Sequence, residues 1–143
     1  MRTSFVLALG LPALLVTVPQ PSSAQRSQPK SAVYATFERS GTNTELVGLA
    51  VGDLSPGFKV MLSCSGPSCS FDTKTINISS NVKVLALTDM FVDTNLQPGT
   101  IVEVRVLRDG TTGRVYQYVT RSTDNPKLTL QCLPPGASQP VAC

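Results

Sequence analysis

Apolar and polar residues alternate with a period of two along most of this chain. In 58–64 and again in 102–106, an apolar residue occupies every second position. This period places alternate side chains on one face of an extended segment, which is typical of a half-buried β-strand. Similar segments, separated by Gly, Pro and Asp turns, predict seven or eight short strands, over 33–38, 46–54, 58–64, 71–78, 82–86, 101–108, 114–121 and 128–132.

Turn residues and glycines indicate how these strands connect. Two glycines in the loop 109–113 join the clearest pair of strands into a hairpin. Thr88 is predicted to cap a single helical turn over 88–91, and Gly48 and Gly52 predict a bulge or a close backbone contact. Short strands without a long helix favour an all-β fold. We therefore predict an antiparallel β-sandwich of about seven strands with one short helical turn.

The first 24 residues have the features of a secretory signal peptide. Arg2 precedes an apolar stretch over 5–18, two prolines follow it, and Ser22 and Ala24 provide small residues for cleavage. A transmembrane helix needs about 20 apolar residues. Because this stretch is shorter and contains proline, we expect cleavage and no membrane span afterwards. The protein is then secreted or extracellular.

Cleavage after residue 24 divides the chain into three parts. The signal peptide covers 1–24, a flexible polar leader covers 25–31, and one β-domain covers 32–143. The whole chain has a formal net charge of +3 and no run of Lys or Arg. Nucleic-acid binding requires clustered cations, so we expect no nucleic-acid partner, and we expect a monomer.

The cysteines are Cys64, Cys69, Cys132 and Cys143. An even number in a short exported chain predicts disulfides, for which three pairings exist. The short spacings and the Gly and Pro residues between them favour two local bridges, 64–69 and 132–143. A zinc site is the alternative interpretation, and the lack of His and the oxidising destination argue against it.

Catalytic chemistry has little support in the sequence. The chain has no His, which excludes Ser–His nucleophilic catalysis. Asp89 and Asp93 are the nearest pair of carboxylates, but they flank a predicted surface turn, where solvated side chains are the ordinary interpretation. We therefore predict no catalytic residue, no metal site and no cofactor, and we expect that the protein is not an enzyme.

Aromatic residues suggest one speculative ligand-binding site. The chain has no Trp and three Tyr. Tyr116 and Tyr118 are two positions apart, so they share one face of a strand. If that face lies in the core, the two rings are ordinary packing residues. If it is solvated, they form a strip on which a sugar ring would stack.

Two stretches resemble known extracellular β-domains. The segment 96–106 begins Leu-Gln-Pro-Gly-Thr and continues as alternating strand residues, which resembles the fibronectin type III pattern. A second resemblance spans 47–143. It rests mainly on Cys-x-Gly-x-x-Cys at 64–69, Gly-x-x-Gly-x-Val at 110–115 and Cys-Leu-Pro-Pro-Gly at 132–136 with a closing cysteine. These elements resemble the cysteine-bearing β-domains at the C-termini of exported actinobacterial proteins. The resemblance implies an immunoglobulin or fibronectin type III-like sandwich that serves as an extracellular accessory domain.

These observations lead to three hypotheses for function. The first is a secreted, non-enzymatic structural or interaction domain that contacts the cell envelope, or an extracellular protein or glycan, through loops or an exposed sheet edge. The second is a small glycan-binding module that uses Tyr116 and Tyr118. The third is a secreted inhibitor that presents the loop 132–143, which a disulfide and several prolines would hold in one conformation.

Overall fold

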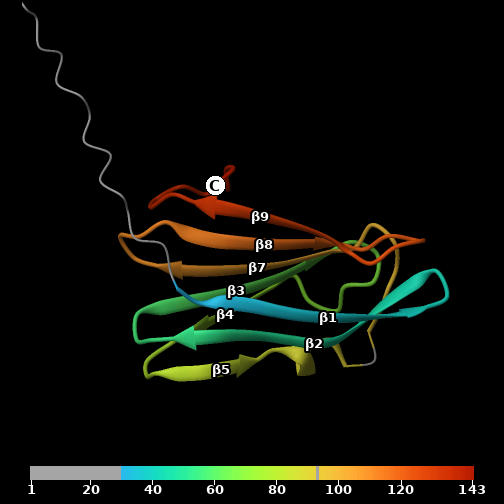
Figure 1. The fold of residues 1–143 in the computed structure, drawn as a ribbon, viewed down its shortest axis with the longest axis horizontal. Coiled ribbons are helices and arrows are strands. Elements are labelled where there is room, and N and C mark those ends of the chain that lie inside the picture. Colours follow the sequence, from blue (N-terminus) through green and yellow to red (C-terminus); the bar gives the residue numbers. More distant parts are fainter. Residues whose placement is uncertain (1–29, 93) are drawn as a thin grey trace, which may run out of the picture.

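The computed structural model describes residues 30–92 and 94–143. The expected signal peptide, and the expected leader up to residue 29, lie outside the described residues. The described part contains nine strands in two antiparallel sheets and one short 3-10 turn (Figure 1). The predicted all-β sandwich is confirmed.

The smaller sheet has the strand order β1-β2-β5, and the short strand β6 pairs with the beginning of β2. Its strands are β1 (Ala32–Ser40), β2 (Asn43–Leu54), β5 (Val82–Ala86) and β6 (Asn95–Leu96). The register of β1 and β2 shifts between Thr36 and Phe37, which leaves Val47 of β2 without a partner. This bulge lies beside Gly48, where the sequence predicts an irregularity.

The larger sheet has the strand order β4-β3-β7-β8-β9, and all its neighbouring strands are antiparallel. Figure 1 shows β9, β8, β7 and β3 following one another across it. Its strands are β3 (Phe58–Ser65), β4 (Thr73–Asn77), β7 (Ile101–Arg108), β8 (Gly113–Val119) and β9 (Lys127–Leu133).

The core lies between the inner faces of the two sheets. Alternation along β7 directs Val102, Val104 and Val106 inward, where all three are fully buried. Leu49 and Val51 of β2 belong to the same cluster and come from the opposite sheet. Complete burial of a Val or Leu side chain contributes about 1.5–3 kcal/mol relative to exposure. The hydrophobic effect on these inner faces therefore holds the two sheets together.

Two local features differ from the sequence prediction. Thr88 begins the 3-10 turn η1 (Thr88–Phe91), but the N-cap position is Leu87 and no side chain caps the turn. The Thr88 hydroxyl instead accepts a hydrogen bond from the Leu49 N–H at 2.9 Å and lies 3.3 Å from the Leu49 carbonyl, which ties η1 to β2. Strand β6 has no counterpart in the prediction, because two residues are too few to show a period.

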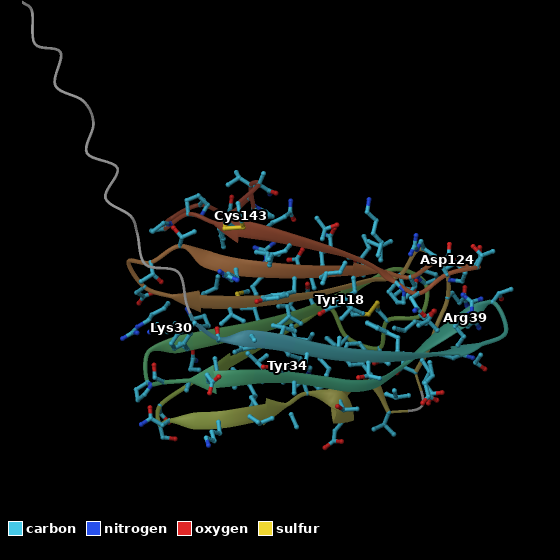
Figure 2. The ribbon with its side chains drawn as sticks, viewed as in Figure 1. Lys30, Tyr34, Arg39, Tyr118, Asp124 and Cys143 are labelled. Atoms are coloured by element: carbon cyan, nitrogen blue, oxygen red, sulfur yellow. A yellow bond between two sulfur atoms is a disulfide. The ribbon has the colours of Figure 1, made fainter. Side chains whose placement is uncertain are left out.

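The long axis of the sandwich has two distinct ends. The Arg39 end comprises the β1–β2 turn and the connection 120–126 between β8 and β9. The tail end comprises the β7–β8 loop 109–112 and the C-terminal segment 134–143, which we call the tail. Figure 2 labels Arg39 and Asp124 at the first end and Cys143 towards the second.

Candidate functional site

The four cysteines form the two local disulfides that their spacing favours. The Cα atoms of Cys64 and Cys69 are 5.5 Å apart, and those of Cys132 and Cys143 are 5.0 Å apart. The first bridge closes a loop at the Arg39 end, and the second ties the tail to β9. All four thiols are oxidised, so they offer neither a nucleophile nor a zinc ligand.

Tyr116 and Tyr118 point into the core rather than into solvent. Their exposed fractions are 9% and 6%, and Tyr118 packs against Phe37 of the other sheet with ring centroids 5.3 Å apart. Burial, and secondarily the neighbouring Tyr116, raises the pKa of Tyr118 above its ordinary value. These two rings therefore do not form the exposed platform that the glycan hypothesis requires.

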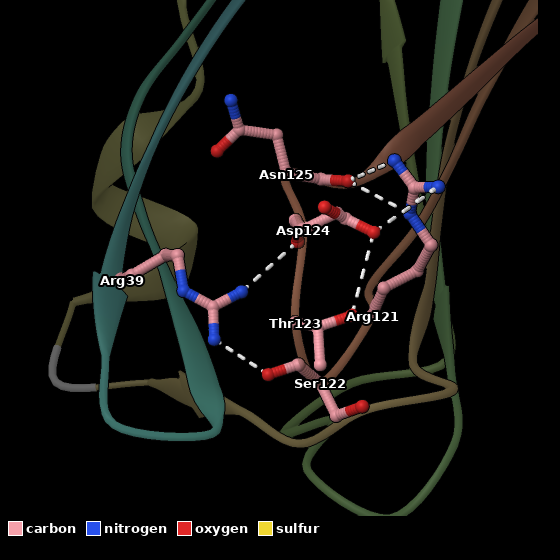
Figure 3. A network of polar contacts seen from close by, with 6 residues as sticks. All are labelled: Arg39, Arg121, Ser122, Thr123, Asp124 and Asn125. Atoms are coloured by element: carbon pink, nitrogen blue, oxygen red, sulfur yellow. Dashed lines mark hydrogen bonds and ion pairs between the residues drawn. The ribbon is translucent and has the colours of Figure 1, made fainter.

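At the Arg39 end, two arginines hold the β8–β9 connection. Arg39 donates hydrogen bonds to the main-chain carbonyls of Ser122 at 2.5 Å and Asp124 at 3.1 Å (Figure 3). Arg121 donates two hydrogen bonds to the Asn125 carbonyl, at 2.7 and 2.9 Å. Arg39 thus fastens the β1–β2 hairpin of one sheet to a loop of the other, and its role is structural.

A buried threonine pair organises the same end. The Thr120 hydroxyl donates to the Gln97 carbonyl at 2.6 Å and accepts from the Thr100 N–H at 2.9 Å. The 64–69 disulfide loop packs on this corner, because Ser68 Oγ accepts from the Gln97 N–H at 2.8 Å. A Cβ atom added to Gly66 would lie 3.0 Å from the Thr100 Cα. The segment that resembles the fibronectin type III pattern is therefore a packed corner.

A polar cluster on the outer face of the larger sheet holds part of the tail. Glu103 is nearly buried; it forms an ion pair with Arg105, with Oε1 and Nε 2.5 Å apart, and accepts from Gln117 Nε2 at 3.2 Å. Arg105 Nη1 also donates to the Ser138 carbonyl at 3.4 Å. The charges of Glu103 and Arg105 are thus used to position the tail.

The loop 132–143 is fixed at both ends. Cys132 and Val141 exchange two backbone hydrogen bonds of 2.8 Å, so the tail returns alongside β9. Leu133 is 7% exposed, whereas residues 136–139 are exposed. What the loop presents to solvent is therefore a short tethered turn, and the inhibitor hypothesis stays a prediction that depends on it.

A pocket of about 170 Å³ lies at the tail end, between the β7–β8 loop and the turn 134–137. Leu107, Gly113 and Leu133 contribute its apolar lining. A Cβ atom at position 113 would lie 2.5 Å from Leu107 Cδ2, so the glycine allows the leucine to lie across β8. Pockets for drug-sized ligands occupy about 300–1,000 Å³. This pocket is therefore suited to a group of side-chain size.

Three charged residues also line the pocket. They are Lys59, Arg108 and Asp109, and together they carry one net positive charge. The Arg108 guanidinium carbon lies 5.4 Å from the centre of the Phe58 ring, which is a cation–π contact. Phe58 belongs to the core and stands opposite Arg108 in the β3–β7 register, so the guanidinium covers the inner side of the sheet at this end. Lys59 stands opposite Leu107, on the outer side that lines the pocket.

The free edge of β9 is the second candidate site. In an antiparallel ladder, the N–H and C=O groups of a residue point to the same side, and this side alternates along the strand. Cys132 directs its groups away from β8, towards Val141. Leu130 and Leu128, two and four positions earlier, therefore direct theirs away from β8 as well. Among the described residues, the tail forms backbone hydrogen bonds with this edge at Cys132 only.

The side chains of Leu128 and Leu130 are unusually exposed for the inner face of a sheet. They stand opposite Tyr118 and Tyr116 in the β8–β9 register, yet their exposed fractions are 51% and 43%. The path of the larger sheet has five strands and that of the smaller sheet has three. The smaller sheet therefore leaves the inner side of β9 largely uncovered.

Other kinds of site find no support in the part of the chain that the structure describes. No three His, Cys, Asp or Glu residues lie close enough there to hold a metal ion. No helix in that part is long and apolar enough to cross a membrane. Asp93, one of the carboxylates considered from the sequence, lies outside the described residues. Comparisons with known protein families, with curated proteins and with solved structures find no match for this chain.

Proposed function

We propose that this chain is an exported, non-enzymatic interaction domain that binds an extended segment of a partner protein along the free edge of β9. Export is supported by the signal-like sequence of residues 1–24 and by the two disulfides. A non-enzymatic role is supported by the lack of His in the sequence. The observation that carries the binding mode is the exposed Leu128–Leu130 edge.

The chemistry of this edge specifies the kind of partner. Leu128 and Leu130 offer unpaired N–H and C=O groups, which an added strand satisfies with a regular ladder of hydrogen bonds. The same two residues offer exposed apolar side chains, against which alternate residues of the added strand would pack. Natural proteins usually shield such edges with charge, proline or a covering segment. Pro126 and Lys127 shield one end of the β9 edge, and the tail covers the other end. The stretch of edge that stays open is therefore short.

Hydrogen exchange followed by NMR tests whether the edge is free. We expect the amides of Leu128 and Leu130 to exchange faster than those of Thr129 and Gln131, because only the latter pair donates to β8. Short peptides selected from a displayed random library against the immobilised domain then serve as probes. Peptides that bind should slow exchange at Leu128 and Leu130.

Two substitutions test the binding mode on these peptides. Leu130→Pro removes an N–H that points away from β8, so it disturbs the edge without breaking the β8–β9 ladder. We expect it to weaken peptide binding by at least about ten-fold, the equivalent of about 1.4 kcal/mol. Leu128→Lys should also weaken binding, whereas Val84→Lys, at a 65% exposed position on β5, is the matched control. Unchanged binding by Leu130→Pro and Leu128→Lys would contradict the proposal.

A further inference from the structure

We propose that the free edge of β1 binds one extended peptide segment of another protein, whose aliphatic side chains cover Leu128 and Leu130. A segment in this position adds a strand to the smaller sheet, whereas a segment along the β9 edge adds one to the larger sheet. The two positions lie in different layers of the sandwich and use the backbone groups of different strands. The β1 proposal therefore does not rest on the proposed function, and either one can fail without the other.

The backbone of β1 has unpaired groups on the side that faces away from β2. The Leu49 carbonyl accepts from the Leu87 N–H at 2.8 Å, and the Leu49 N–H donates to a hydroxyl of η1, so Leu49 directs both groups away from β1. Ala35 stands opposite Leu49 in the β1–β2 register. The two residues of such an antiparallel pair point apart, so Ala35 directs its own groups away from β2, and so does Val33, two positions earlier. Among the described residues, β1 pairs with no strand except β2.

This edge lacks the charges that shield the other edges of the sandwich. The edge strands β4, β5 and β9 each carry a lysine, namely Lys74, Lys83 and Lys127. A lysine on an edge strand discourages pairing with a further strand. Residues 32–37 of β1 include neither a charged residue nor a proline. This stretch of β1 is therefore open to strand addition.

A strand added to this edge lies over the inner side of β9. Figure 1 shows β9, β8, β7 and β3 in one layer, and β1, β2 and β5 in the other, following one another in the same direction. β1 packs over β8, where the rings of Phe37 and Tyr118 are 5.3 Å apart. Leu128 stands beside Tyr118 on the next strand, β9. The next strand position beside β1 is therefore opposite Leu128 and Leu130, whose exposed side chains it would remove from water.

The surroundings specify an extended segment with aliphatic residues at alternate positions. Its inward side chains meet Leu128 and Leu130, and its outward side chains lie in solvent beside Tyr34, which is 61% exposed. Antiparallel pairing of the β1 strands of two copies is sterically blocked. In such a dimer, β8 of the second copy, which lies under its own β1, would need the place that β9 occupies. The occupant is therefore a single segment of another protein.

The test is an NMR titration of the isotope-labelled domain with the capped heptapeptide Lys-Val-Thr-Val-Thr-Val-Lys. In the free domain, we expect the amides of Val33 and Ala35 to exchange faster than that of Tyr34, which donates to β2. The peptide should slow exchange at Val33 and Ala35 and shift the methyl signals of Leu128 and Leu130. The peptide Lys-Ser-Thr-Ser-Thr-Ser-Lys is the matched control, and it should have neither effect.

Two substitutions identify the surfaces that hold the peptide. Ala35→Pro removes an N–H that points away from β2, so it disturbs the edge without breaking the β1–β2 ladder. We expect it to weaken binding of the valine peptide by about ten-fold. Leu128→Lys changes an exposed position that does not contact β2, and its charge under the bound segment should weaken binding as well. Val84→Lys, at an exposed position on β5, should leave the affinity unchanged.

The same spectra contain the results that would overturn the proposal. Slow exchange at Val33 and Ala35 in the free domain would show that the edge is already covered. Slowed exchange at the amides of Leu128 and Leu130, with none at Val33 and Ala35, would place the peptide on the β9 edge instead. Equal effects of the valine and serine peptides would remove the role of the aliphatic side chains. A dimer in sedimentation velocity that itself slows exchange at Val33 and Ala35 would make a second copy the occupant.

Discussion

Basic side chains stand near the turns at both ends of the sandwich. At the Arg39 end, Arg39 donates to the carbonyls of Ser122 and Asp124 in the β8–β9 connection. At the tail end, Arg108 packs over the Phe58 ring, and neither Arg108 nor Lys59 joins an ion pair among the described residues. The difference lies in the neighbouring backbone. An arginine is held by hydrogen bonds where a loop brings carbonyl oxygens within reach, and it packs on an aromatic ring where no loop does.

The disulfide loops at the two ends also differ in how closely they pack on the rest of the domain. The 64–69 loop is held by Ser68 and by the close approach of Gly66 to Thr100. The tail is held at Val141 and Ser138, but residues 136–139 are exposed. We therefore expect changes at the Arg39 end to alter stability more than changes at the tail end.

The largest expected effect is at Thr120, which is 2% exposed. Thr120→Val keeps the shape of the side chain but leaves the Gln97 carbonyl and the Thr100 N–H without their bonds to the hydroxyl. We expect a loss of about 2 kcal/mol in the free energy of unfolding, measured by denaturant titration.

Thr44→Val is the matched control for this change. Thr44 is 1% exposed, and its hydroxyl has no hydrogen-bond partner among the described residues. Removing an unsatisfied hydroxyl should leave the stability unchanged within about 0.5 kcal/mol or raise it. Equal losses for the two variants would show that the hydrogen bonds of Thr120 are not what stabilises the corner.

An intermediate effect is expected from Arg39→Met, which keeps much of the apolar stem and removes the hydrogen bonds to the β8–β9 connection. Because the site is exposed, we expect a loss of about 1 kcal/mol in the free energy of unfolding. Arg108→Met at the tail end should cost less, about 0.5 kcal/mol, from the lost cation–π contact. A loss for Arg108→Met as large as that for Arg39→Met would remove the distinction between the two ends.

The smallest effect concerns pH and Tyr118. Its raised pKa means that the unfolded chain releases the Tyr118 proton near pH 10, about the ordinary pKa of tyrosine, while the folded chain still keeps it. The contribution of Tyr118 to stability is therefore fully present below about pH 10 and is lost as the pH rises through the folded-state pKa. Thermal unfolding midpoints should fall less steeply above this pH in Tyr118→Phe than in the parent chain. Tyr34→Phe, at a 61% exposed position, should leave the steeper fall in place.

Most of the fold could be predicted because it depends on local pattern. The period of two in β3 and β7 and the turn glycines of the β7–β8 loop identify strands without knowledge of their neighbours. The disulfide pairs could be predicted for a similar reason, since short loops bring their own cysteines together. Thr88 shows the limit of this reasoning. Its hydroxyl accepts a hydrogen bond from Leu49, which lies 39 positions earlier in the chain.

The candidate sites could be predicted only in part. Tyr116 and Tyr118 share one face, as the sequence indicates, but both faces of β8 carry apolar residues. Val115, on the outer face, is as fully buried as the core valines of β7. Periodicity therefore cannot tell which face of β8 points inward. The pocket and the β9 edge have no local signature, because Lys59 and the tail meet only after the larger sheet has formed.

By itself, the sequence determined the all-β class, the strand segments and the two local disulfide pairs. Each of these depends on residues close together in the chain. The tertiary structure alone decided that Tyr118 is buried, that Arg39 is bound by carbonyls 83 and 85 positions away, and that Leu128 and Leu130 are left uncovered. These outcomes depend on which sheet lies over which strand. That arrangement results from packing between distant segments rather than from any local pattern.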